Sequence, residues 1–211
     1  MLHKSQHAKH KHIKPKELVK RYFLFIISLF FSGLGVAMTK HAALGVSPIS
    51  SVANILSLRF TFLSIGNWLI VTNCLMVLAQ ILILRKKFQP IQLLQIPLSF
   101  LFGYFTDFGM WLISPFPTEA YPVRLMLVVG GVVVLGFGIS LAVTASVVMS
   151  AGEGLVKAVA DVTHKTFGTV KVIFDVSYVS FSILLSLLLF GSSIQGTREE
   201  PLSPPWGRGL W

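Results

Sequence analysis

Five apolar stretches, each about as long as a bilayer-crossing helix, constrain this 211-residue sequence more than any other feature. They cover residues 22–38, 66–84, 93–113, 123–143 and 172–190. A hydrocarbon core about 30 Å thick takes about 20 apolar residues in an α-helix. In lipid every backbone N–H and C=O needs a partner in the chain, and a helix supplies these partners within one segment. The sequence therefore predicts an all-α, polytopic transmembrane helix bundle with five spans.

Lysine and arginine are distributed unevenly between the two sides of these spans. If the N-terminus is inside, thirteen of the 18 Lys and Arg residues lie on that side, in 1–21, 85–87 and 144–171. Positive charge is retained on the cytoplasmic side of spans, so we predict a basic cytoplasmic arm over residues 1–21 and a first span that is a retained signal anchor. Nucleic-acid binding is not predicted despite a pI near 10.0, because the charge borders apolar segments.

The sequence also resembles itself at a spacing of about 103 residues, with one gap inside the match. The matching positions carry small or polar residues: Gly33 with Gly136, Gly35 with Gly138, Ser47 with Ser150, Ser64 with Thr166, Gly66 with Gly168, and Asn73 with Asp175. An odd number of spans separates the copies, so they cross in opposite senses, a common plan of secondary transporters. We predict a 3+3 inverted repeat that lacks its sixth helix, with a first half over 22–113, an external loop over 114–122 and a second half over 123–190.

The linker inside each half is too apolar for an ordinary solvated loop. Ser47 before Pro48 is typical of an N-cap followed by a proline in the first helical turn, and Ser150 holds the matching place. Two interpretations of the short helices predicted here stay open. As broken helices they would aim partly positive N–H groups at the bundle interior and could bind an anionic group. Alternatively, each is an amphipathic helix that lies in the membrane interface.

Polar residues in and beside the apolar spans are the candidate sites for a solute or ion, because charge deep in a bilayer usually faces a bundle interior or a wet cavity. The candidates are Asp175, Asn73, Asp107, Ser47, Ser150, Glu153, Lys157 and Lys171. The spacing of Glu153 and Lys157 permits an i,i+4 ion pair. The alternative for the intramembrane residues is structural: a charge that snorkels to the interface, or a hydrogen bond that clamps helices.

The glycine pairs are predicted to be close-packing sites between helices, and not part of a ligand site. These are Gly33 with Gly35 and Gly136 with Gly138. Catalysis is not predicted, since the sequence has no His-Glu-x-x-His, Gly-x-Ser-x-Gly or Gly-x-x-x-x-Gly-Lys motif. Cys74 is the one cysteine and lies in an apolar span, so no metal site and no cofactor are predicted either.

Short motifs recur along both halves: Gly33–Ala37, Leu44–Pro48, Ser64–Trp68, Gly152–Leu155 and Gly168–Lys171. Together with Asp175 they resemble the YczE/YyaS/YitT-type bacterial integral membrane proteins, over about residues 21–198. The resemblance implies a multi-pass protein of the bacterial inner membrane, sometimes labelled transporter-like, without a settled activity. It also implies a sixth apolar span after the glycine-containing turn at 191–196.

The C-terminal residues depart from that family pattern. Residues 191–211 contain three prolines and can form no span. Codons that permit this tail, read one base out of frame from Glu199, can spell Gly-Thr-Ile-Ile-Ala-Ala-Met-Gly-Ala-Gly-Phe-Met, the start of an apolar helix. We therefore hypothesise that residues 200–211 are a frameshift product. The alternative is a short polar tail on the outer side.

The predicted function is that of a small-solute transporter or permease of unknown substrate, with its site between the two halves. The expected partners are the lipid bilayer and a small polar or anionic solute. The alternative is a non-transporting membrane factor that supports the assembly or regulation of another protein. Sensitivity of ion coupling to Asp175→Asn would favour transport, and a stoichiometric protein partner would favour the alternative.

Overall fold

The structure is a computed structural model that describes residues 15–190, and this part of the chain is helical apart from its connections. Its α-helices are α1 (Pro15–His41), α2 (Pro48–Arg59), α3 (Ile65–Leu84), α4 (Gln95–Ile113), α5 (Tyr121–Ala145), α6 (Ala151–Thr163) and α7 (Phe167–Phe190), and the 3-10 helices η1 (Arg85–Lys87) and η2 (Pro90–Leu94) precede α4. Five of them, α1, α3, α4, α5 and α7, are long and apolar enough to cross a membrane. The predicted all-α bundle with five spans is confirmed.

Several helices extend beyond the apolar stretches from which they were predicted. Helix α1 begins at Pro15, so residues 15–21 of the predicted basic arm belong to the first helix. Helix α7 begins at Phe167, five residues before the predicted span, because the Thr166 hydroxyl accepts the N–H of Thr169 (3.4 Å) and starts the helix in a polar turn. Residues 1–14 and 191–211 lie outside the described residues, and with them most of the basic arm and the predicted frameshift tail.

The two short helices begin where the serine pattern predicts. Ser47 is the N-cap of α2, with proline in the first turn, and Ser150 is the N-cap of α6. Both linkers therefore contain a helix of about three turns, and each lies against the long helices of the bundle.

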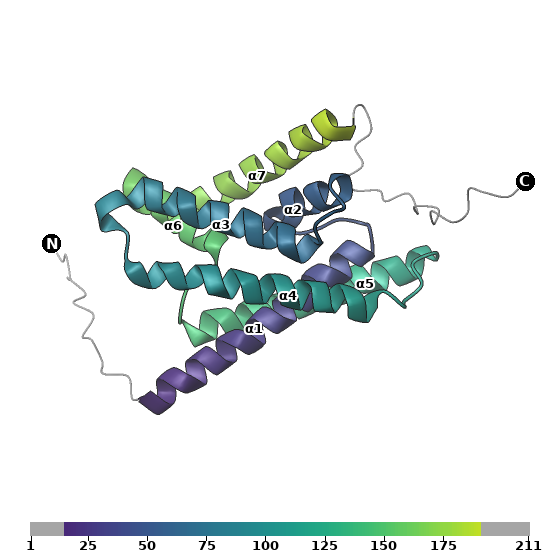
Figure 1. The fold of residues 1–211 in the computed structure, drawn as a ribbon, viewed down its shortest axis with the longest axis horizontal. Coiled ribbons are helices and arrows are strands. Elements are labelled where there is room, and N and C mark those ends of the chain that lie inside the picture. The colour runs from purple at the N-terminus through teal and green to yellow at the C-terminus, as the bar shows by residue number, and fades with distance from the viewer. Residues whose placement is uncertain (1–14, 191–211) are drawn as a thin grey trace, which may run out of the picture.

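The helices of the two halves pack reciprocally (Figure 1). Helix α1 crosses α5, so the first helices of both halves lie against each other. Helix α2 of the first half packs on α7 of the second, while α6 of the second half packs on α3 of the first. Helix α4 lies along α1 and α3. The short helix of each half thus packs against a long helix of the other half, and the interface between the halves contains both linkers.

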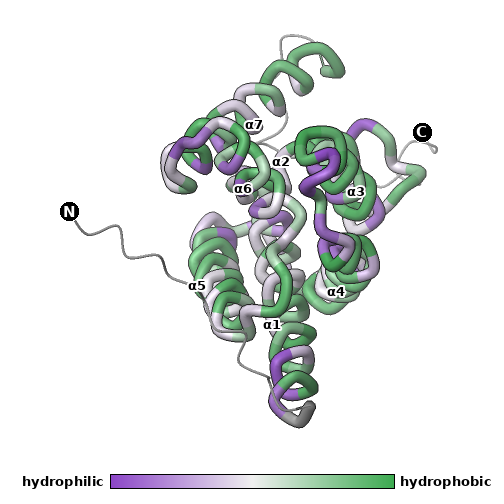
Figure 2. Tube along the Cα trace, turned by 90° about the vertical axis from the view of Figure 1, so that its left-hand side faces the viewer, coloured by the Kyte–Doolittle hydropathy of each residue, from purple (hydrophilic) through white to green (hydrophobic). Residues whose placement is uncertain are grey.

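Small and polar side chains fill the interior, and large apolar ones cover much of the outside. Ala37, Ala53, Gln80 and Thr106 are completely buried, whereas Trp111 is 69% exposed. Figure 2 shows apolar residues along the long helices and hydrophilic ones gathered mainly at helix ends and connections. Because lipid is as apolar as leucine, close approach at small residues and interhelical hydrogen bonds must hold such a bundle together.

Candidate functional site

The first turns of α2 and α6 contact each other between the two halves. A Cβ built on Gly152, the second residue of α6, would lie 3.0 Å from Cδ1 of Ile49, the second residue of α2. The two residues hold the same place relative to the N-caps Ser47 and Ser150. The N-terminus of a helix carries unpaired N–H groups and a partial positive charge. Two such ends therefore converge at the interface between the halves.

The two N-cap serines use their hydroxyls differently. The Ser150 hydroxyl accepts the backbone N–H of Glu153 (3.4 Å), the ordinary capping bond. The Ser47 hydroxyl pairs instead with the Ser50 hydroxyl at 2.8 Å and makes no capping bond. The predicted cap positions are confirmed, but in the described part of the chain no side-chain cap bond is made to the first turn of α2.

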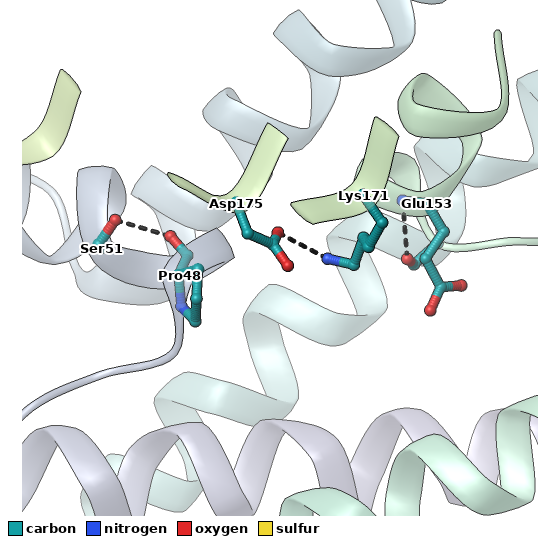
Figure 3. Close-up of polar contacts among 6 residues, drawn as sticks. Pro48, Ser51, Glu153, Lys171 and Asp175 are labelled. Atoms are coloured by element: carbon teal, nitrogen blue, oxygen red, sulfur yellow. Dashed lines mark hydrogen bonds and ion pairs between the residues drawn. The ribbon is translucent and has the colours of Figure 1, made fainter. Parts of the chain in front are cut away.

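An ion pair on α7 lies next to these helix ends. Lys171 Nζ donates to Asp175 Oδ1 at 2.7 Å, and the two side chains are 28% and 29% exposed. Helix α7 packs on both short helices, and in the view of Figure 3 the pair lies between Pro48 and Ser51 of α2 and Glu153 of α6. The pairing cancels the net charge, which lowers the free-energy cost of holding a carboxylate inside a span.

Asn73 occupies the same place on α3 that Asp175 occupies on α7. Its side chain is 8% exposed, and α3 packs on α6 as α7 packs on α2. The structure therefore places Asn73 inside the bundle at the interface between the halves. Its role in binding a solute stays a prediction.

Asp107 clamps two helices at a different place. From α4, its carboxylate accepts the Ser64 hydroxyl (Oδ2, 2.5 Å) and the Gly66 backbone N–H (Oδ1, 2.8 Å). Ser64 is the N-cap of α3, so Asp107 caps the first turn of a neighbouring helix. Of the two interpretations offered for this residue, the geometry matches the hydrogen-bonded clamp. A negative charge also opposes the positive end of α3.

A buried glutamine pair that was not predicted from the sequence lies at the first turn of α6. Gln80 of α3 donates to Gln95 Oε1 of α4 (2.9 Å) and to the carbonyl oxygen of Ala151 (3.0 Å), and Gln95 donates back to Gln80 Oε1 (3.3 Å). The two side chains are 0% and 3% exposed. The signal was available, because an amide inside an apolar span, even near its end, needs a partner inside the bundle. The pair fixes one of the two converging helix ends to the long helices.

The ion pair that the spacing of Glu153 and Lys157 permits does not form. Among residues 15–190 the ion pair present is the one between Lys171 and Asp175. Lys157 is exposed on α6. An i,i+4 pair on an exposed helix face contributes only about 0.2–0.5 kcal/mol, which is too little to hold two long side chains in one geometry.

Three of the four glycines predicted to pack helices do so. Gly35 and Gly138 lie in the α1–α5 crossing, and Gly33 lies against α4. For Gly136 the prediction is wrong in the described part of the chain, because a Cβ built there would meet no atom within 4 Å. No group of three or more His, Cys, Asp or Glu side chains that could hold a metal occurs among the described residues.

The sequence matches a family described as of unknown function (DUF6198) over residues 19–199. No curated protein and no solved structure matches the chain significantly. The narrower resemblance to the YczE/YyaS/YitT-type proteins stays a prediction.

Proposed function

This chain belongs to the DUF6198 family, whose function is unknown, and we propose from its own geometry that it is a small-solute transporter or permease of the bacterial inner membrane, with a cytoplasmic N-terminus. The observation that carries the proposal is the convergence of the first turns of α2 and α6 beside the Lys171–Asp175 pair. Among the described residues, five helices are long and apolar enough to cross a membrane, and two of them, α3 and α7, pack on both short helices.

The reciprocal packing of the two halves supports this proposal. Helix α2 rests on α7 and α6 rests on α3, as expected if the halves are inverted copies of one unit. In alternating access, one repeat rocks against the other around a site at their interface. The ends of α2 and α6 lie at that interface, so a solute bound there would be reached from each side in turn.

The charges at the site favour an anionic solute and coupling to a proton. The helix ends and the Lys171 ammonium attract an anion, but Asp175 occupies Lys171 at 2.7 Å. A proton on Asp175 removes its negative charge and leaves Lys171 available to the solute. The solute and the proton would then bind together and cross together.

A flux experiment with a matched control tests this mechanism. The purified chain is first heated with inorganic phosphate, sulfate and short-chain carboxylates, because a solute that binds the folded state raises the unfolding temperature. The uptake of the solute that raises the unfolding temperature is then measured in proteoliposomes. Asp175→Asn should abolish the dependence of flux on an imposed pH gradient, while Asp161→Asn, at an exposed position of α6, should leave it intact. Equal pH dependence in both variants would contradict the mechanism.

The second candidate function is that of a non-transporting factor for assembly or regulation of another membrane protein. The exposed glycines on α5 and α7 leave room for the close approach of another helix, and they favour this role only if that helix belongs to a different protein. A protein that co-purifies stoichiometrically, together with unaltered function of Asp175→Asn and Asp107→Asn variants, would favour this role over transport.

A further inference from the structure

The two halves of the bundle differ at a pair of matching glycines on α1 and α5. A Cβ built on Gly33 of α1 would lie 2.9 Å from the backbone nitrogen of Thr106 on α4. The matching Gly136 of α5 is exposed, and a Cβ there would meet no atom of the described residues within 4 Å. Within residues 15–190, the first half therefore makes the close helix approach that Gly33 permits, and the second half does not make the matching approach at Gly136.

The same difference occurs at the first turns of α3 and α7. A Cβ on Gly66 would collide with the Asp107 carboxylate (2.5 Å to Cγ) and with the backbone of α4, whereas one on Gly168 would again meet nothing within 4 Å in the described part of the chain. Ser64 donates its hydroxyl to Asp107, while its counterpart Thr166 pairs with the hydroxyl of a residue in its own turn, three positions on. The first turn of α7 thus contains a glycine that would permit the close approach of another helix, but no helix among residues 15–190 approaches it.

The matching glycines that lack a neighbour among the described residues are those whose first-half counterparts contact α4. Gly35 and Gly138 are also a matching pair, and both are closed. A Cβ on Gly35 would lie 2.6 Å from the nitrogen of Leu135 on α5, and one on Gly138 would lie 2.7 Å from the nitrogen of Ser32 on α1. The contacts of the two halves therefore match where α1 crosses α5. They differ at the positions where the first half contacts α4.

Burial along the spans shows the same asymmetry. In the most apolar window of α1 and of α3, 39% of the residues are buried, against 11% in the corresponding windows of α5 and of α7. Figure 2 shows α4 on the right beside α1 and α3, and no described helix in the corresponding place beside α5 and α7 on the left. Two helices of the second half thus share a face that no residue among 15–190 covers.

We propose that this face of α5 and α7 is the docking site of a further membrane-spanning helix that follows α7 in the same polypeptide. In the first half α4 follows α3 after only ten residues, 85–94, so the order of the repeat puts its counterpart directly after α7. Residues 191–211, as the sequence reads, contain no apolar run of about 20 residues. The frameshift hypothesised at residues 200–211 accounts for this, since it would replace the apolar segment with the present tail.

The contacts of α4 define the chemistry of the docked helix. It presents small residues, as α4 presents Gly103 and Gly109, so that its backbone can approach Gly136 and Gly168. It also places an acceptor like the Asp107 carboxylate at the first turn of α7, whose N–H groups carry a partial positive charge. A helix that is merely apolar would leave this turn without its acceptor.

Disulfide trapping of a defined probe tests the docking site. The probe is a synthetic peptide with the sequence of residues 88–113, which contains α4, with Phe105→Cys. The full chain carries Cys74→Ser and Gly136→Cys, and the mixture is oxidised in detergent micelles. We expect a cross-link, and we expect Gly168→Leu to reduce it at least five-fold by filling the second glycine position. An unchanged cross-link in the Gly168→Leu variant would overturn the docking site.

The matched control places the cysteine at Ile173. This residue is 53% exposed on α7 and lies five positions after Gly168, about 140° around the helix. A cross-link to Ile173→Cys as strong as that to Gly136→Cys, or no cross-link to Gly136→Cys at all, would overturn the proposal. Thermal unfolding of each variant without peptide shows that the bundle is intact, and neither measurement depends on transport.

A second experiment tests the source of the helix. One base is inserted at the codon for residue 199, and the longer product is expressed with the same cysteine at position 136. The restored helix should raise the unfolding temperature and prevent the peptide from cross-linking, because the face is already occupied. A downstream frame that encodes no apolar helix, or a restored product that still cross-links the peptide, would overturn the same-polypeptide source.

Discussion

The crossing of α1 and α5 can be tested by changing two glycines that differ only in their surroundings. A Cβ on Gly35 would lie 2.6 Å from Leu135 N and 2.8 Å from the Gly131 carbonyl oxygen, where ordinary contact is 3.4–4 Å. These are backbone atoms that cannot rotate away, so Gly35→Ala must push the helices apart, and such overpacking costs about 1–3 kcal/mol. Gly136→Ala meets nothing within 4 Å in the described residues.

Comparison of the two variants isolates the packing effect. Alanine favours a helix over glycine by about 1 kcal/mol, and this benefit is common to both substitutions, so it cancels in their difference. The free energy of unfolding of the Gly35→Ala variant should therefore be about 1–3 kcal/mol lower than that of the Gly136→Ala variant. The Gly136→Ala variant should be at least as stable as the parent chain.

The assay is reversible unfolding in mixed micelles, in which the fraction of sodium dodecyl sulfate is raised and helicity is followed by far-ultraviolet circular dichroism. Gly138→Ala serves as a second clashing variant, because its Cβ would meet α1 as that of Gly35 meets α5. If Gly35→Ala and Gly136→Ala unfold within about 0.5 kcal/mol of each other, the close crossing of α1 and α5 is refuted. Addition of the docked helix should make Gly136→Ala destabilising as well.

Three further predictions use the same unfolding assay. Asp107→Ala removes the charged acceptor at the first turn of α3 and should cost about 1.5–3 kcal/mol, so a loss below about 0.5 kcal/mol would contradict the clamp. Gln80→Leu leaves Gln95 unpaired and should cost about 1–3 kcal/mol, part of which the double Gln80→Leu/Gln95→Leu variant recovers; a double variant no better than the single one would contradict the pair. Lys171→Met and Asp175→Asn should each lower the unfolding temperature more than the two together, because each alone leaves one charge unpaired in a span; additive losses would contradict this.

Much of the architecture follows from local sequence properties. The length of each apolar stretch predicts the number of spans, and the Ser47 and Ser150 patterns predict where the short helices begin. Boundaries were missed where a polar turn starts a span, as at Phe167. Hydropathy registers the lipid-facing length of a helix and does not register a first turn that carries threonine, glycine and lysine.

The candidate site could be predicted in its residue types and less well in its contacts. The Lys171–Asp175 pair joins residues one turn apart, so the spacing alone made it available. The Glu153–Lys157 spacing is the same, yet that pair does not form, and Asp107 bonds to a helix start that lies 41 residues away along the chain. Spacing within one helix cannot decide these outcomes, because Lys157 is exposed and the partners of Asp107 belong to another helix.

The sequence by itself determined the five spans and the short helices between them, since hydrophobicity and caps are properties of the chain alone; the internal repeat that it predicts stays a prediction. Only the tertiary structure decided which polar groups are joined, as in the link from Gln80 and Gln95 to the first turn of α6. It also decided that another helix lies against Gly33, while no described residue lies against Gly136, although the sequence treats the two glycines as equivalent. The physical reason is that a glycine permits a close approach, but a neighbouring helix must be present to make it.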